Sequence, residues 1–126
     1  MDSVTVGENS YQVTLSIHET EGRGVVGVLF GGDTPHLGCS VVATPSKRLY
    51  EDGITCSVSQ ICLPGHKDVY AASAVAKILV LELNQPVCIA AGIHVDRATE
   101  TDIQNLMDNA KSCAYLWLKK HEGDLK

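Results

Sequence analysis

The first half of the chain alternates between apolar and polar residues in the way that β-strands do. Apolar and polar side chains change place at nearly every position of residues 11–18, and a period of two predicts a strand with one dry and one wet face. Residues 25–30 are nearly all apolar, which is typical of a strand covered on both faces. Further strands are predicted over residues 39–44 and 54–63, the last with a bulge at residues 59–60, where the alternation slips.

In the second half the apolar residues follow the spacing of helices. They recur on one face over residues 69–83, which predicts a first helix. The short apolar run of residues 87–93 predicts a buried central strand. A second apolar stripe over residues 103–117 predicts a last helix. Thr99 and Asp102 resemble a capping box at its start, with aspartate in place of the usual glutamate or glutamine.

The order of elements, β-β-β-β-α-β-α, predicts an α+β fold. Strands that precede helices favour a mostly antiparallel sheet with two helices packed on one face. The last strand follows a helix, so it can pair in parallel with a neighbour and make the sheet mixed. The 126 residues suffice for one domain. We expect a single domain over residues 1–126, with a core over about 10–120 and short flexible ends.

Composition and charge narrow the class of protein. Apolar residues make up 44% of the chain, yet no apolar run reaches the roughly 20 residues that a membrane-spanning helix needs. No secretory signal is visible over residues 1–12, so the cytoplasm is the expected compartment. A net charge of −5 argues against nucleic acid as a partner, because phosphate neutralisation needs clustered lysine and arginine. The five cysteines contain no C-x-x-C pair, which favours buried free thiols.

Three of the five histidines lie in loops that directly follow predicted strands. They are His36, His66 and His94, and each of their loops also contains glycine and an acidic residue. Loops held by a rigid scaffold are where function concentrates. If the strand ends lie together, the three loops form one cleft. The other two histidines, His18 and His121, are predicted to be exposed and without a role.

Such a cleft is open to more than one chemistry. Neutral imidazoles bind divalent metal ions or act as general acids and bases, which leaves a small metal- or histidine-dependent hydrolase or lyase open. The cleft suits a phosphate better, because two helices are predicted to begin at its second and third loops. Helix starts offer unpaired N–H groups and partial positive charge, and Lys67 and Arg97 lie beside them.

The three loops, taken in order, resemble a known family. Their sequences are Gly31-Gly32-Asp33-Thr34-Pro35-His36-Leu37-Gly38, then Leu63-Pro64-Gly65-His66-Lys67, then Ala91-Gly92-Ile93-His94-Val95-Asp96 followed by Ala98-Thr99. With this spacing they resemble the small D subunit of gallate decarboxylase and its relatives, the LpdD-like prenylated-flavin chaperones, over about residues 11–117. That family is similar in fold to proteasome assembly chaperones.

The resemblance implies a protein that binds prenylated FMN, or FMN, as a carried ligand. It would protect the cofactor or deliver it to a UbiD-like decarboxylase, as an accessory subunit with no catalytic residues and no metal site of its own. Carried over by position, the implied ligand-binding residues are Gly32, Asp33, His36, Gly65, His66, Lys67, His94, Asp96 and Arg97. Arg97 stands where we expect the family to prefer a small polar residue, although an arginine can still pair with a phosphate. Leu37, Ile93 and Val95 are expected to line an apolar slot for the flavin ring.

An interaction module without a small-molecule ligand is a further alternative, suggested by the apolar face of the last helix. We expect a homodimer under each of these functions. A sheet with helices on one face leaves its other face without cover, and a second copy is the simplest partner for it.

Overall fold

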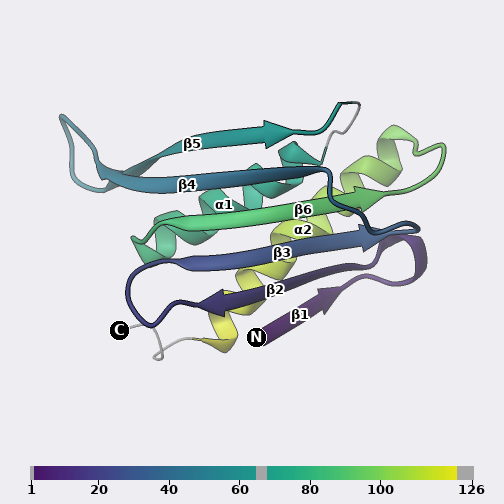
Figure 1. The fold of residues 1–126 in the computed structure, drawn as a ribbon, viewed down its shortest axis with the longest axis horizontal. Helices are drawn as coiled ribbons and strands as arrows, with labels where there is room; N and C mark the ends of the chain where they lie inside the picture. The colour runs from purple at the N-terminus through teal and green to yellow at the C-terminus, as the bar shows by residue number, and fades with distance from the viewer. Residues whose placement is uncertain (1, 65–67, 122–126) are drawn as a thin grey trace.

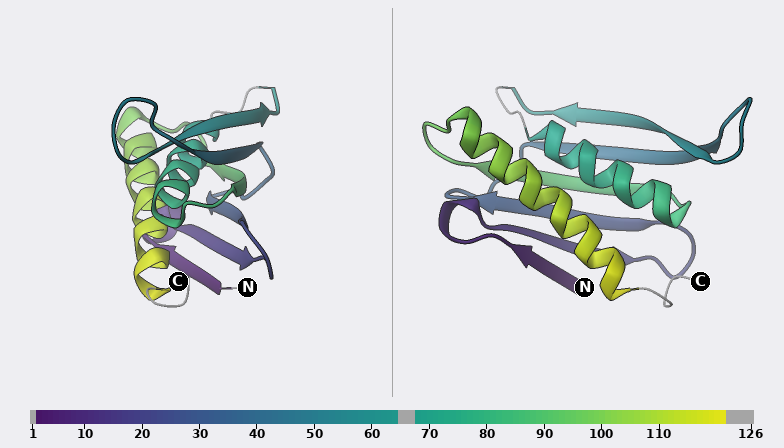
Figure 2. Two further views of the ribbon diagram at one scale, coloured as in Figure 1. Left: turned by 90° about the vertical axis from the view of Figure 1, so that its left-hand side faces the viewer. Right: turned by 180° about the vertical axis from the view of Figure 1, so that it is seen from behind.

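One six-stranded sheet with two helices on one face forms the molecule. The computed structural model describes residues 2–64 and 68–121. The elements are β1 (Asp2–Val6), the short 3-10 helix η1 (Asn9–Tyr11), β2 (Val13–Glu19), β3 (Val25–Gly32), β4 (Cys39–Lys47), β5 (Ile54–Cys62), α1 (Val69–Leu83), β6 (Val87–His94) and α2 (Glu100–Lys120). Both helices lie behind the sheet in Figure 1, and Figure 2 shows them side by side on that face. The predicted α+β class is confirmed.

The sheet is mixed because β6 enters its middle. The strand order is β1-β2-β3-β6-β4-β5. β3 and β6 pair in parallel, whereas the other neighbours pair antiparallel. β4 runs against β6 and β5 runs against β4, so β3, β5 and β6 all point the same way, as their arrowheads show in Figure 1. The chain therefore leaves these three strands at the same end of the sheet.

The strands differ from their prediction in three details. Residues 2–6, expected as part of a flexible end, form β1, whose backbone pairs with β2 and whose Val4 is buried. Five residues carry too short a pattern to be recognised without that partner strand. The ladder between β4 and β5 keeps one register throughout, so the bulge at residues 59–60 is absent. Gln60 interrupts the apolar pattern without breaking the ladder, and its side chain accepts a hydrogen bond from Ser73 on α1.

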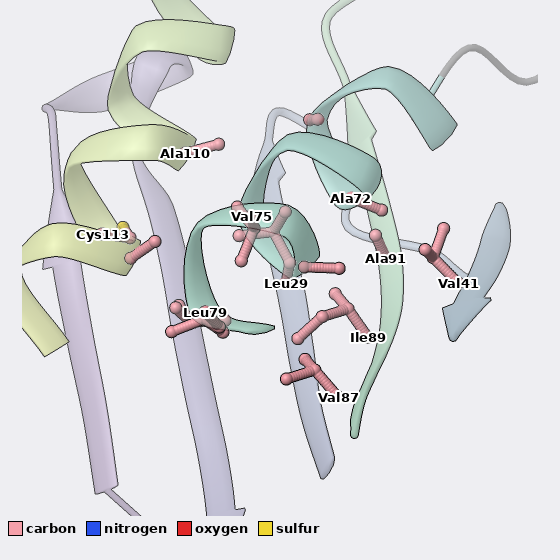
Figure 3. Packing of buried hydrophobic residues seen from close by; sticks show 14 of the residues in the cluster. Leu29, Val41, Ala72, Val75, Leu79, Val87, Ile89, Ala91, Ala110 and Cys113 are labelled. Atoms are coloured by element: carbon pink, nitrogen blue, oxygen red, sulfur yellow. The ribbon is translucent and has the colours of Figure 1, made fainter. Parts of the chain in front are cut away.

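The core lies between the sheet and the helices. Leu29 and Ile89 of the sheet pack against Val75 and Leu79 of α1, as Figure 3 shows. A buried side chain of this kind contributes about 1.5–3 kcal/mol to stability. The prediction that residues 25–30 are covered on both faces is wrong, because β3 buries only alternate side chains. Both helices occupy one face, so the side chains on the other face of β3 stay partly exposed.

The helices begin and end as the sequence indicates. α1 ends at Leu83, after which Asn84 adopts a left-handed conformation with φ 52° and its N–H bonds to the carbonyl of Val80. At the start of α2 the Thr99 hydroxyl accepts from the Asp102 N–H, and the Asp102 carboxylate accepts from the Thr99 N–H. The predicted capping box is therefore confirmed. No α-helix in the described ranges has the length and hydropathy that crossing a membrane requires.

His121 is buried, which contradicts the prediction that it is exposed. Only 8% of the residue is accessible. Its ring stacks on Trp117 with centroids 4.2 Å apart. Nδ1 donates to the Trp117 carbonyl at 2.8 Å and Nε2 donates to the Asp2 carboxylate at 2.7 Å. The reason is tertiary, since the carboxylate that holds this ring lies at the other end of the chain. His121 thereby joins the end of α2 to β1.

The His121–Asp2 pair makes stability depend on pH. Burial lowers the pKa of His121, but the hydrogen bonds to Asp2 and to the Trp117 carbonyl outweigh it, and the pKa is raised. The bond from His121 lowers the pKa of Asp2. The histidine therefore stabilises the fold fully below its unfolded pKa of about 6.5, and this is lost as pH rises through the folded value. The Asp2 carboxylate stabilises the fold at pH values above its ordinary pKa of 3.8. This contribution is lost as the pH falls through the lowered pKa of the folded state.

We expect the melting temperature to fall as pH rises above about 6.5, and the fall to be smaller in His121→Phe. Phenylalanine keeps the stacking on Trp117 but cannot be protonated. Thermal unfolding followed by circular dichroism at several pH values measures the slope. His18→Phe is the control, because His18 is exposed and its replacement should leave the slope unchanged. An unaltered slope in His121→Phe would show that this pair does not set the pH dependence.

Candidate functional site

The loop between β3 and β4 is held against β6 by backbone hydrogen bonds and by close backbone contacts at glycines. The N–H groups of Asp33 and Thr34 both donate to the carbonyl of His94, at 2.7 and 3.3 Å. A Cβ placed on Gly92 would lie 1.3 Å from the carbonyl oxygen of His36, and one on Gly32 would lie 2.2 Å from that of His94. Glycine at both positions therefore lets the loop touch the end of β6, which brings His36 next to His94.

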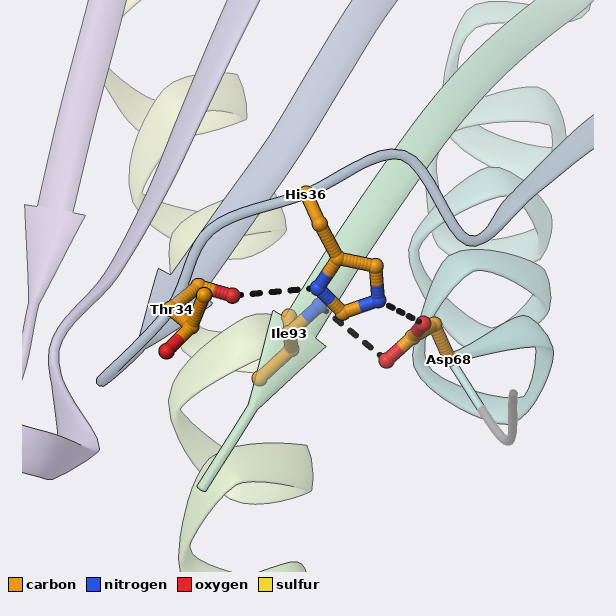
Figure 4. A network of polar contacts seen from close by, with 4 residues as sticks. All are labelled: Thr34, His36, Asp68 and Ile93. Atoms are coloured by element: carbon orange, nitrogen blue, oxygen red, sulfur yellow. Dashed lines mark hydrogen bonds and ion pairs between the residues drawn. The ribbon is translucent and has the colours of Figure 1, made fainter. Parts of the chain in front are cut away.

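His36 and Asp68 form a partly buried pair at this end of the sheet (Figure 4). The ring Nδ1 lies 3.0 Å from the carbonyl oxygen of Thr34, and Nε2 lies 3.1 Å from one oxygen of the Asp68 carboxylate. The other Asp68 oxygen accepts the N–H of Ile93 at 3.0 Å. A carbonyl can only accept, so Nδ1 carries a hydrogen. The contact to Asp68 joins the loop after β3 to the residue that precedes α1.

His94 forms a second imidazole–carboxylate pair beside the first. Its Nε2 donates to Asp96 at 2.8 Å. Its ring meets that of His36 edge-on, with centroids 6.0 Å apart and an interplanar angle of 78°. The His94 side chain is 49% exposed, against 22% for His36. Asp33 of the same cluster accepts a hydrogen bond from Ser10 at 2.6 Å. Of the two imidazoles, His94 is the more accessible to a ligand.

An apolar cavity opens on the other side of Asp68. Its volume is about 310 Å³, and it lies between the first turns of α1 and α2 and the end of β6. The lining residues are Asp68, Tyr70, Ala71, Ile93, Ile103, Leu106 and Met107. Asp68 thus contacts His36 and also borders a largely apolar space. Ile93 lines the cavity as expected, whereas Leu37 is 57% exposed and Val95 packs against the core.

The two helix starts differ in what they offer an anion. The start of α2 is occupied by its own side chains, because Thr99 and Asp102 cap it and Glu100 adds negative charge. The Thr99 N–H lowers the pKa of Asp102, with a further contribution from the hydroxyl of Tyr11. The Asp68 side chain does not cap α1. At α2 the capping box therefore uses the N–H groups of Thr99 and Asp102, so this helix start offers an anion fewer donors than expected, whereas the expectation stays open for α1.

Comparison with known proteins identifies the family. A model described as the prenylated flavin chaperone LpdD-like domain matches residues 7–122. The chain belongs to this family. The resemblance found in the three loops is thereby confirmed. A search of the curated proteins finds no match.

The fold of a solved structure is similar to that of the LpdD-like chain over nearly its full length. It is a chain of the crystal structure of a novel chaperone complex for yeast 20S proteasome assembly. The TM-score is 0.61 with 20% sequence identity, over 97% of this chain and 96% of that one. At this identity the likeness concerns the fold alone, and it agrees with the fold that the family resemblance implied.

The structure brings together part of the predicted site of this LpdD-like chain. Gly32, Asp33, His36, His94 and Asp96 lie at one end of the sheet. Arg97 follows in the loop before α2, exposed and with a φ of 54°. Gly65, His66 and Lys67 lie outside the described residues. Within the described ranges, no group of three or more histidine, cysteine, aspartate or glutamate side chains is arranged to hold a metal ion.

Sequence reasoning named Asp68 only as the acidic residue of the second histidine loop, outside the predicted ligand-binding set, and it missed most of the cavity. Asp68 was visible as an acid before an apolar helix, but its contacts with His36 and Ile93 depend on how α1 packs against β6. Ile103, Leu106 and Met107 of the cavity belong to the apolar stripe that predicted α2. An apolar stripe has the same pattern whether it faces a packed core or an open cavity.

We expect Gly92→Ala to destabilise the protein by about 1–3 kcal/mol, because the new methyl group would overlap the backbone of the His36 loop. Gly22→Ala is the matched control, since nothing lies within 4 Å of a Cβ placed there. It should be neutral or slightly stabilising. Chemical denaturation measures both. Equal unfolding free energies for the two variants would contradict the close approach of the loop to β6.

Proposed function

We propose that this chain binds prenylated FMN, or FMN, at the end of the sheet that His36, Asp68 and His94 occupy. It then protects the cofactor and delivers it to a UbiD-like decarboxylase. The supporting observation is the combination of an imidazole–carboxylate pair with an adjacent apolar cavity, in a member of the prenylated flavin chaperone family. Such a neighbourhood suits a ligand with a large apolar ring system and a polar edge.

The size of the cavity supports a division of the ligand between two environments. Ligand pockets measure roughly 300–1,000 Å³, so a cavity of about 310 Å³ is at the small end of that range. It suits the apolar part of the flavin, including the carbon atoms that prenylation adds. The ribityl phosphate then extends out of the cavity, and the exposed side chain of His94 lies where it can meet the polar edge of the ring.

The phosphate requires positive charge outside the cavity. We assign it to Arg97, to the start of α1, and to His66 and Lys67, which lie outside the described residues. The three aspartates near this end already have hydrogen-bond donors, because Asp33 accepts from Ser10, Asp68 pairs with His36, and Asp96 pairs with His94. Their partnered charges oppose an incoming phosphate less than free carboxylates would.

A carrier must also release its cargo. Among the described residues that line the cavity, Tyr70 is the aromatic one, and 67% of it is exposed. Stacking on the flavin ring is therefore limited. Binding that depends on apolar burial and a few hydrogen bonds is suited to transfer onto a decarboxylase that holds the cofactor more tightly.

We expect His94→Ala to weaken the binding of prenylated FMN by about 1–3 kcal/mol, because it removes an exposed imidazole that can hydrogen-bond to the ligand. His18→Ala is the control, since His18 is exposed near the opposite end of the sheet, where it pairs with Val26. Titration of the purified chain followed by flavin fluorescence measures both affinities. Absence of saturable binding of either flavin at micromolar concentration would refute the proposed function.

A variant of the cavity extends the same titration. Ile103→Ser removes apolar surface from the cavity wall. It should weaken the binding of prenylated FMN more than the binding of FMN. Leu116→Ser is the matched control on α2, because Leu116 is partly exposed and does not line the cavity. If Ile103→Ser lowers the affinity for the two flavins equally, the carbon atoms added by prenylation do not lie in this cavity.

We also propose that two copies of the chain pair through the uncovered face of the sheet. Val26, Cys88 and Val42 lie in register across β3, β6 and β4 on that face. Val26 is 48% and Val42 41% exposed. A self-complementary apolar surface of this kind is what a two-fold dimer buries.

Light scattering at tens of micromolar is expected to give the mass of a dimer, and Val42→Lys to give that of a monomer. Leu49→Lys is the control, because Leu49 is exposed in the connection between β4 and β5, outside the sheet. It should leave the mass unchanged. A monomeric wild-type chain would overturn the proposed dimer.

A further inference from the structure

Two cysteines face each other across the ladder between β4 and β5. Cys39 at the start of β4 is paired in register with Cys62 at the end of β5. Residues paired in this way point to the same face of the sheet. Their burial differs, because Cys39 is buried in the core whereas Cys62 is exposed. The exposure of Cys62 also departs from the expectation that the thiols are buried.

The hydrogen-bonding pattern gives the spacing of this pair. Leu63 donates to Gly38 and Arg48 donates to Gly53, so hydrogen-bonded pairs stand at both ends of the ladder. Hydrogen-bonded and non-hydrogen-bonded pairs alternate along an antiparallel ladder. Cys39 and Cys62 therefore form a non-hydrogen-bonded pair, for which the Cα atoms are about 4.5 Å apart. A disulfide spans Cα separations of roughly 4.4–6.8 Å, so these two residues can be joined without moving the backbone.

We propose that Cys39 and Cys62 are a redox-modification site that closes to a cross-strand disulfide by exchange with a small disulfide such as oxidised glutathione. The Cys62 thiolate attacks one sulfur of the glutathione disulfide, and one glutathione thiolate leaves. The Cys39 thiol then loses its proton to solvent, and its sulfur attacks Cys62, which forms the protein disulfide and releases the second glutathione. The two cysteines together lose two electrons and two protons, and the glutathione disulfide gains them.

The order of the two attacks follows from the surroundings of each thiol. Cys62 is exposed and open to a dissolved disulfide. Burial raises the pKa of Cys39 to about 11, and the nearby Asp68 carboxylate and Cys62 add to this. A buried thiol of high pKa reacts slowly with a reagent in solution. Cys39 is therefore the resolving thiol, which attacks only the sulfur held opposite to it.

The bond would tie together the two chain segments that supply the His36–Asp68 pair. β4 begins where the His36 loop ends, and the chain leaves β5 at Cys62 on its way to Asp68. Gly38, the neighbour of Cys39, lies so close to Asp68 that an added Cβ would be 2.0 Å from its carboxylate. A disulfide here would fix the base of both segments, and by constraining the unfolded chain it would also raise the melting temperature by several degrees.

The test uses the full chain, reduced and then equilibrated with oxidised glutathione. Intact-mass spectrometry should show the loss of two hydrogen atoms, and peptide mapping should find Cys39 linked to Cys62. In Cys39→Ser a glutathione adduct should accumulate on Cys62, and in Cys62→Ser the loss of two hydrogen atoms should disappear. The oxidised wild-type chain should melt several degrees higher than the reduced one.

Cys56→Ser provides the matched control. Cys56 lies on β5 and points to the same face, but its register partner is Pro45, so it has no thiol opposite. This variant should still close the disulfide. The proposal is overturned if the wild-type chain forms only glutathione adducts, or if the loss of two hydrogen atoms survives in Cys62→Ser. Neither readout depends on flavin binding.

Discussion

The parallel pairing of β3 with β6 is the constraint on which the rest of the structure depends. Because β6 enters the sheet beside β3 and runs the same way, the loops that follow these strands leave the sheet together. The loop after β3 can then cross the end of β6 only where no side chain intervenes, which Gly32 and Gly92 provide. The close approach of two imidazoles from distant parts of the sequence is a consequence of that one backbone contact.

Asp68 connects the parts of the candidate site. It precedes α1, accepts the N–H of Ile93 from β6, and faces the His36 ring from the loop after β3. A carboxylate that is 7% exposed is tolerated because these donors satisfy its oxygens. The same residue borders the apolar cavity between the helices. A ligand in that cavity would therefore be in contact with the carboxylate that pairs with His36.

The opposite end of the molecule also contains a histidine–carboxylate pair, which stabilises the fold. His121 closes the end of α2 onto β1 through Asp2 and stacks on Trp117. The two ends of the described chain are thus fixed to each other by a histidine–carboxylate pair. Since this pair is far from the cavity, its contribution to stability can be varied without touching the candidate site.

Much of the architecture can be predicted from the local pattern of the sequence. Alternation in β2, the helical stripes of α1 and α2, and the capping box at Thr99 depend on neighbouring residues, and all were predicted correctly. Glycine and histidine in three loops were sufficient to indicate the family. These features are local because periodicity, capping and turns arise from side chains only a few positions apart.

Other features were decided by the tertiary structure. β1 is a strand because it pairs with the edge of β2. β3 is covered on one face only, because both helices pack on that same face. His121 is buried because its ring is hydrogen-bonded to Asp2. The apolar residues of α2 do not reveal that some of them line a cavity, and Asp68 does not reveal that it will be buried against His36. Each of these depends on partners distant in sequence, and no local pattern contains the position of such a partner.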